Sequence, residues 1–78
     1  GVFVMDKLLM ILEDVRPDID FNNEKNLVTD GILDSFDVIT IVDEISEEFE
    51  IDIKPKYLTA DNFSSAETIW ELIKMLKG

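Results

Sequence analysis

The residue types that could do chemistry in this sequence are concentrated between Asp30 and Asp37. Here Ser35 lies between two aspartates, Asp34 and Asp37. Asp34 is a good helix N-cap, and Asp37 three residues later can complete a capping-box-like pair, which predicts a helix that begins at Ser35. The free N–H groups at a helix N-terminus favour a phosphate. A serine at the first helical position is therefore a candidate site for a phosphodiester.

The chain itself offers little catalytic chemistry, because it contains no cysteine and no histidine. This excludes disulfides, Cys/His zinc sites, a catalytic triad and a histidine general base. Asp18, Asp20 and Asn22 resemble the start of a calcium loop. However, Asn23 stands where an EF-hand needs glycine, and Thr29 stands where it needs glutamate. We therefore expect neither an enzyme nor a metal site, and any thiol would have to come from a cofactor.

The pattern around Ser35 resembles the acyl carrier protein family. Gly-Ile-Leu precedes Asp34-Ser35-Phe36-Asp37, and Val-Ile-Thr-Ile-Val-Asp-Glu-Ile-Ser-Glu-Glu-Phe-Glu-Ile follows it. In that family an Asp-Ser-Leu motif opens the second helix, and its serine carries a 4′-phosphopantetheine arm. Phe36 replaces the usual leucine, an apolar-for-apolar change, and the resemblance extends from about Val4 to Leu76.

The resemblance implies that Ser35, with Asp34 before it, is the attachment site of the arm. A phosphopantetheinyl transferase would be a partner, and coenzyme A would be the donor. The arm would then carry acyl groups as thioesters between acyl-loading and acyl-processing enzymes, in fatty acid or related acyl-chain biosynthesis. The protein would be a substrate and a shuttle without a catalytic group of its own.

Other functions remain open beside this one. The Gly-Ile-Leu-Asp-Ser run also looks like D-alanyl carriers, and polyketide and peptidyl carriers are further alternatives. The acid at Asp37 and the strong overall acidity favour an acyl carrier over a peptidyl carrier. In a different class, the chain would be an unmodified helical interaction module in which Ser35 only starts a helix.

The charge of the chain predicts basic protein partners. The net charge is −11, from 7 basic and 18 acidic residues, which argues against nucleic acid and anionic membranes. Nine acids and no Lys or Arg fall between residues 26 and 53. The candidate partner-binding residues are Asp37, Val38, Asp43, Glu44, Glu47 and Glu48. In the family, the position of Val38 is more often polar and that of Thr40 more often acidic. Asp43 occupies a position that is often apolar in the family. The identity of the partners therefore stays open.

Helical spacing of apolar residues predicts a first helix from about Val4 to Val15. Arg16 suits its C-terminal end and Pro17 stops it. The long connection from Asp18 to Leu33 should be held over the helices by three apolar side chains, Ile19, Phe21 and Leu27.

The second helix is expected from Ser35 to Glu48, with five residues turned inward: Phe36, Ile39, Val42, Ile45 and Phe49. A brief third helix is expected near Tyr57 to Asn62, followed by an inward Phe63. Ser64 and Glu67 form a capping-box pattern that should open the last helix. That helix should bury Ala66, Ile69, Ile73 and Leu76, with Trp70 and Leu72 flanking them.

These elements predict an all-α fold for a single domain, residues 1–78. It is expected to be a small four-helix bundle, with three main helices, one short helix and a long first loop, and a hydrophobic fraction of 46% suffices for its core. Residues 1–3 are expected to be a tag remnant or disordered. The sequence shows no signal peptide and no membrane-spanning stretch, so we expect a cytoplasmic monomer that does not insert into membranes.

Overall fold

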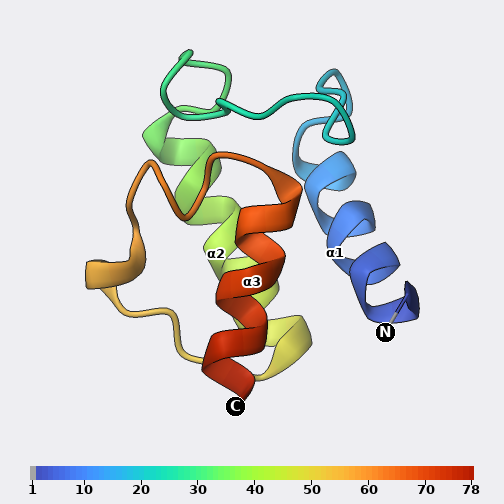
Figure 1. The fold of residues 1–78 in the computed structure, drawn as a ribbon, viewed down its shortest axis with the longest axis vertical. Coiled ribbons are helices and arrows are strands. Elements are labelled where there is room, and N and C mark those ends of the chain that lie inside the picture. Colours follow the sequence, from blue (N-terminus) through green and yellow to red (C-terminus); the bar gives the residue numbers. More distant parts are fainter. Residues whose placement is uncertain (1) are drawn as a thin grey trace.

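The computed structural model describes the backbone of residues 2–78 and the side chains from residue 5 onward. Its elements are α1 (Val2–Val15), α2 (Ser35–Phe49), η1 (Pro55–Tyr57) and α3 (Ala66–Lys77), where η1 is a single 3₁₀ turn (Figure 1). Within the described residues all of the regular structure is helical, which confirms the predicted all-α class.

The predicted ends of the first two helices are close to the observed ones. α1 ends at Val15 as expected, before Pro17, but it begins at Val2 rather than Val4. The backbone of Val2 and Phe3 belongs to this helix, whereas Gly1 and the side chains of Val2, Phe3 and Val4 lie outside the described residues. α2 begins at Ser35 as predicted and extends one residue further, to Phe49.

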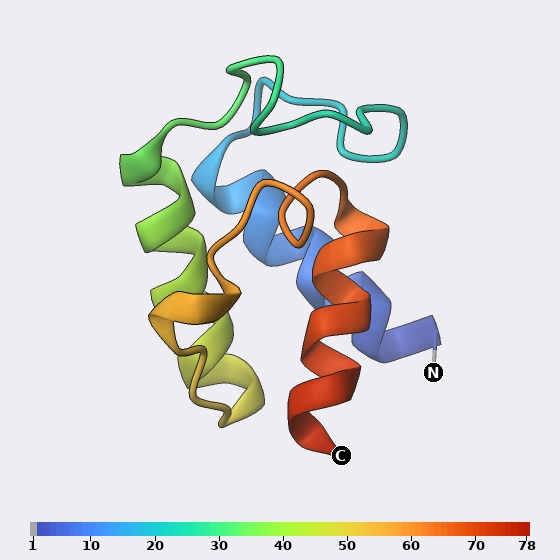
Figure 2. The same ribbon diagram turned by 60° about the vertical axis from the view of Figure 1, so that its left-hand side comes forward.

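The helices are arranged so that α1 runs opposite to α2 and α3 and packs against both (Figures 1 and 2). The connection of residues 16–34 crosses the end of the molecule at which α1 finishes and α2 starts. The core lies between the three helices. Its fully buried helical side chains are Leu8, Leu12, Ile41, Ile45, Ile69 and Ile73.

The long connection is held down as the sequence predicts. Ile19, Phe21 and Leu27 are all buried. The N–H of Leu27 donates to the carbonyl of Ser64 (2.9 Å), and the N–H of Leu33 donates to the carbonyl of Leu27 (2.8 Å). The segment that leads into α2 is thus fixed by hydrogen bonds to the turn that precedes α3.

The inward face of α2 was predicted partly wrongly. Ile45 and Phe49 are buried and Val42 is half-buried, but Phe36 is 78% exposed and Ile39 is 56% exposed. Ile41 takes the inward position instead. The helix is apolar on nearly every side in its first two turns, so its own spacing allows more than one inward face. Contact with α1 selects the row Ile41, Ile45 and Phe49, spaced at i, i+4 and i+8.

The start of α3 is displaced by one residue from the prediction. Ser65, not Ser64, is the N-cap: its Oγ accepts from the N–H of Thr68 (3.2 Å), and Thr68 Oγ1 accepts from the N–H of Ser65 (3.1 Å). The expected core residues Ala66, Ile69 and Ile73 are buried. Leu72, expected to flank the core, is buried as well, whereas Leu76 is only half-buried.

The expected short helix at residues 57–62 is not confirmed. The regular element in this region is η1, which lies earlier and spans Pro55–Tyr57, and turn residues follow it up to the buried Phe63. Pro55 explains the shift, because its fixed φ suits the first position of a helical turn. Within this turn, the N–H of Asn62 donates to Thr59 Oγ1 (3.1 Å).

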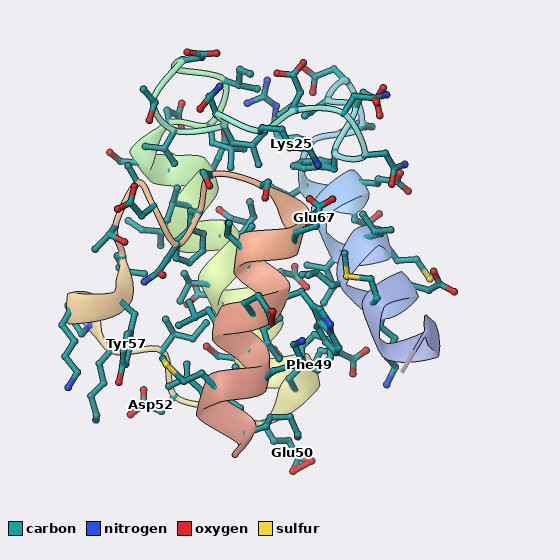
Figure 3. The ribbon with its side chains drawn as sticks, viewed as in Figure 1. Lys25, Phe49, Glu50, Asp52, Tyr57 and Glu67 are labelled. Carbon is teal, nitrogen blue, oxygen red and sulfur yellow. The ribbon has the colours of Figure 1, made fainter. Side chains whose placement is uncertain are left out.

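The far ends of α2 and α3 are joined by a side chain. Lys77 Nζ donates to the carbonyl of Phe49 (2.8 Å), one of the carbonyls that the end of a helix leaves without an intrahelical partner. The rings of Phe49 and Trp70 lie 6.3 Å apart at the same end (Phe49 is labelled in Figure 3). Both helices are therefore anchored away from Ser35, at the opposite end of α2.

Candidate functional site

The start of α2 is the candidate site, and its local geometry is the predicted capping box. Asp34 adopts an extended backbone and its Oδ1 accepts from the N–H of Asp37 (2.8 Å). In return, the N–H of Asp34 donates to Asp37 Oδ2 (3.3 Å). Gly31, three residues before the cap, has a φ of +71°, a conformation that glycine adopts without strain. The predicted helix start and its cap are confirmed.

Ser35 is exposed at the first helical position, where the N–H groups have no intrahelical acceptor. Among the described residues its hydroxyl has no hydrogen-bond partner. A serine needs an adjacent base to become a nucleophile by itself, and the chain has no histidine to supply one. Because Ser35 is exposed, its hydroxyl is accessible to an external reagent. The N-cap of α2 is Asp34, so the hydroxyl of Ser35 is not needed to cap the helix.

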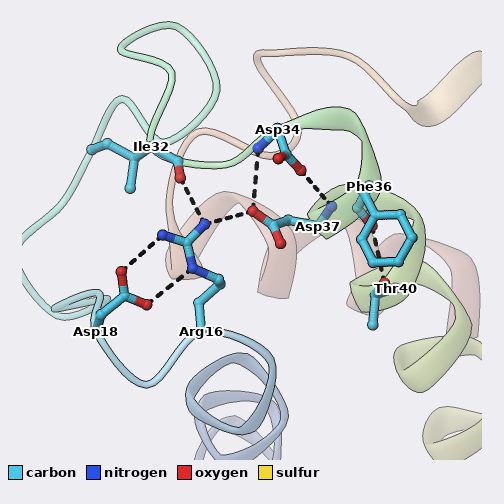
Figure 4. Close-up of polar contacts among 7 residues, drawn as sticks. All are labelled: Arg16, Asp18, Ile32, Asp34, Phe36, Asp37 and Thr40. Carbon is cyan, nitrogen blue, oxygen red and sulfur yellow. Dashed lines mark hydrogen bonds and ion pairs between the residues drawn. The ribbon is translucent and has the colours of Figure 1, made fainter.

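Arg16 connects the end of α1 to this helix start (Figure 4). Its Nη1 donates to Asp37 Oδ2 (2.6 Å) and to the carbonyl of Ile32 (3.1 Å). Its Nε and Nη2 donate to the two carboxylate oxygens of Asp18 (2.9 and 2.8 Å). These contacts, with Asp18 first, raise the pKa of Arg16 above its usual value, and Arg16 in turn lowers the pKa of Asp18.

The network includes two residues for which the sequence predicted other roles. Asp37 was predicted as a partner-binding residue; its side chain is 14% exposed and is paired with Arg16. Arg16 was predicted only as a cation near the end of the first helix. A contact between residues 21 positions apart depends on how α1 and α2 meet, and no local pattern in the sequence indicates it.

An apolar groove of about 430 Å³ opens directly beside Ser35. Val38, predicted as a partner-binding residue, forms part of its wall and is half-buried. The groove lies between the start of α2, the connection before it and the segment after η1. Its lining residues are Val28, Leu33, Asp34, Ser35, Val38, Ile39, Leu58, Thr59, Ala60 and Phe63. Sequence reasoning missed the contribution of residues 58–60, because no motif links them to Ser35.

Exposed apolar side chains lie around this groove. Phe36, Ile39 and Leu58 are 78%, 56% and 38% exposed, respectively. Ile39 and Leu58 also line the groove, and Phe36 directly follows Ser35. The surface next to the candidate serine therefore combines the exposed carboxylate of Asp34 with a set of exposed apolar side chains.

The predicted acidic residues follow along α2. Asp43, Glu44, Glu47 and Glu48 are all exposed. Residues three, four and seven apart share one side of a helix, so Asp43 and Glu47 continue the side that begins with Phe36. Lys7 Nζ lies 3.9 Å from Glu48 Oε2, a loose and exposed pair. In the described part of the chain, no Lys or Arg nitrogen lies within 4.0 Å of the carboxylates of the other three.

The described residues contain neither a metal-binding cluster nor a membrane-spanning helix. They contain no group of three or more acidic side chains arranged to hold a metal ion. None of their helices combines the length and the apolar character required to cross a bilayer.

Comparisons with family models, with curated proteins and with solved structures gave no match to this chain.

Proposed function

We propose that the protein is an acyl carrier whose Ser35 holds a 4′-phosphopantetheine arm. The observation that carries the proposal is the exposed hydroxyl of Ser35, which bonds none of the described residues and lies at the start of a capped helix, beside an apolar groove. The site offers the free N–H groups that favour a phosphate, and open space for the remainder of an arm. The arm would supply the thiol that the chain lacks.

The loading step is a phosphoryl transfer from coenzyme A. The Ser35 oxygen forms a bond to the β-phosphorus, the phosphoanhydride bond breaks, and adenosine 3′,5′-bisphosphate leaves. The serine proton passes to a base of the transferase. The role of the chain is to present the hydroxyl on a rigid helix start, which favours a reactive geometry.

The groove favours an apolar cargo. Its volume of about 430 Å³ falls within the range of small-molecule sites, ~300–1,000 Å³. An acyl chain on the arm could bury its apolar end there while it travels between enzymes. In this proposal η1 takes the place of the short fourth helix, and the protein acts as a monomer in the cytoplasm, in fatty acid or related acyl-chain biosynthesis. D-alanyl, polyketide and peptidyl cargoes remain alternatives.

Partner enzymes would bind the exposed side of α2. Phe36 and Ile39 offer apolar contact near Ser35, and Asp43, Glu44 and Glu47 offer charge further along the helix. Each exposed ion pair contributes only ~0–1 kcal/mol. The acidic field therefore mainly accelerates and orients the encounter with a basic surface, which suits a shuttle that must also dissociate.

Intact-mass measurement after incubation with a phosphopantetheinyl transferase and coenzyme A tests the proposal. The wild-type protein and Ser46→Ala, which removes another serine of α2, should each gain the mass of one arm. Ser35→Ala should gain none. If the wild-type protein gained no mass, the carrier function would be refuted, and the exposed apolar and acidic side of α2 would favour an unmodified interaction module.

A further inference from the structure

Arg16 joins three parts of the chain that are distant in sequence. It follows the last residue of α1, bonds the connection at the carbonyl of Ile32, and bonds the first turn of α2 at Asp37 (Figure 4). Its side chain is 29% exposed and that of Asp37 is 14% exposed, so the contact is shielded from water on most sides. A hydrogen bond between charged groups is shorter and stronger than one between neutral groups, and the exclusion of water strengthens it further.

We propose that Arg16 is a positioning residue for the modification of Ser35; this inference rests on the carrier function proposed above. Asp37 Oδ2 accepts from both Arg16 and the N–H of Asp34, and Asp34 in turn accepts from the N–H of Asp37. Ser35 lies between these two aspartates in the chain. Arg16 thereby fixes the direction of the helix turn that presents the serine hydroxyl.

The local cap does not need Arg16. The two hydrogen bonds between Asp34 and Asp37 form within the first turn of α2, and the buried residues Ile41 and Ile45 hold the rest of the helix. What Arg16 adds is a connection between that turn and the end of α1. Its loss should therefore alter the orientation of Ser35 more than the existence of the helix.

The contact uses properties that belong to arginine and not to lysine. The guanidinium bonds both oxygens of Asp18 through Nε and Nη2, while Nη1 serves Ile32 and Asp37. A lysine ammonium carries its three donors on one nitrogen and cannot bond these groups in the same fork geometry. Arg16→Lys should therefore keep the charge but only part of the positioning.

Charge and positioning predict opposite effects on the transferase reaction. Replacing Arg16 with alanine makes the net charge one unit more negative than −11, which should leave unchanged or improve the encounter with a basic enzyme. A misdirected hydroxyl should instead slow the chemical step. Lys25→Ala is a matched control, because it removes one positive charge from the same connection. Lys25 pairs with Glu67 of α3 (2.8 Å) and not with α2 (Figure 3).

The experiment measures kcat and KM for arm transfer at a temperature at which melting curves show every variant to be folded. Misplacement of a reacting group by about 1 Å can cost up to ~100-fold. For Arg16→Ala we expect kcat to fall by about tenfold, with KM changed by less than about twofold. Arg16→Lys should give an intermediate kcat, and Lys25→Ala should match the wild-type protein.

The outcomes separate this inference from the proposed function. If the wild-type protein accepts the arm and kcat is the same in Arg16→Ala or Arg16→Lys, the positioning role is refuted and the carrier function stands. A higher KM with unchanged kcat would also refute it, because the residue would then act in docking. If Arg16→Ala does not fold, the kcat of Arg16→Lys decides. If the wild-type protein accepts no arm, both proposals are refuted.

Discussion

Two alanine substitutions in α2 test whether its apolar residues are correctly divided between core and surface. Ile41 is fully buried, and replacing a buried isoleucine with alanine costs ~2–5 kcal/mol. Phe36 is 78% exposed, so only about a fifth of its side chain is covered. Because a fully buried phenylalanine contributes ~3–5 kcal/mol, Phe36→Ala should cost less than ~1 kcal/mol. The higher helix propensity of alanine should recover up to ~0.5 kcal/mol of that loss.

These differences are large compared with the total stability. A domain of 78 residues is expected to have a free energy of unfolding of ~4–12 kcal/mol. A loss of ~3 kcal/mol in Ile41→Ala should lower Tm by more than ~10 °C, whereas Phe36→Ala should melt close to the wild-type protein. Urea unfolding followed by far-UV circular dichroism measures both. An equal loss of stability in the two variants would refute the assignment of the inward face.

Substitutions of Phe36 also separate folding from function. Phe36→Ala should remain folded yet accept the arm more slowly, since it removes an apolar contact beside Ser35. Phe36→Leu is the control, because it keeps an apolar side chain at this position. If Phe36→Ala and Phe36→Leu accepted the arm at the wild-type rate, the exposed apolar surface would have no part in docking to the transferase.

Four further predictions follow from the site and its charges. Ser35→Ala should abolish arm uptake in intact-mass measurements and leave far-UV circular dichroism unchanged, because its hydroxyl bonds no described residue. Added sodium chloride or millimolar magnesium should raise Tm, because screening relieves repulsion among the acids of residues 26–53. Glu47 and Glu48, both replaced by lysine, should change stability by less than ~0.5 kcal/mol and slow stopped-flow association with a basic partner enzyme at low salt. The hydrogen bond from Arg16 lowers the pKa of Asp18 from its usual 3.8, so this group stabilises the fold fully above pH 3.8 and ceases to do so as the pH falls through the folded-state pKa. Urea unfolding at a series of pH values measures this effect. Below pH 3.8, the free energy of unfolding of Asp18→Asn should therefore decline less than that of the wild-type protein.

Each of these has a result that would contradict it. A folded Ser35→Ala that still gained the arm would move the attachment site elsewhere. A flat or falling Tm with salt would mean that the acids are locally paired, as Asp37, Glu48 and Asp52 are. An unchanged association rate at low salt would remove the end of α2 from the docking surface. An identical pH profile in Asp18→Asn would show that its pairing with Arg16 adds no stability.

The sequence determined the features that depend on neighbouring residues. Asp34 and Asp37 lie three positions apart, so their reciprocal cap forms within one turn wherever α2 is placed. Pro17 stops α1 for an equally local reason. The inward residues of the long connection were also predictable, because a few apolar side chains in a polar segment can be buried only against the helices.

Tertiary structure decided where local signals were degenerate. Ser64 and Ser65 each have a suitable partner three residues later, and only the observed backbone selects Ser65. The first turns of α2 are apolar on most sides, so packing against α1, not spacing, turned Ile41 inward and left Phe36 outside. The contact of Arg16 with Asp37 joins groups 21 residues apart, and such a pair exists only once the end of α1 and the start of α2 meet. The groove beside Ser35 has the same origin, since segments far apart in the chain form its walls.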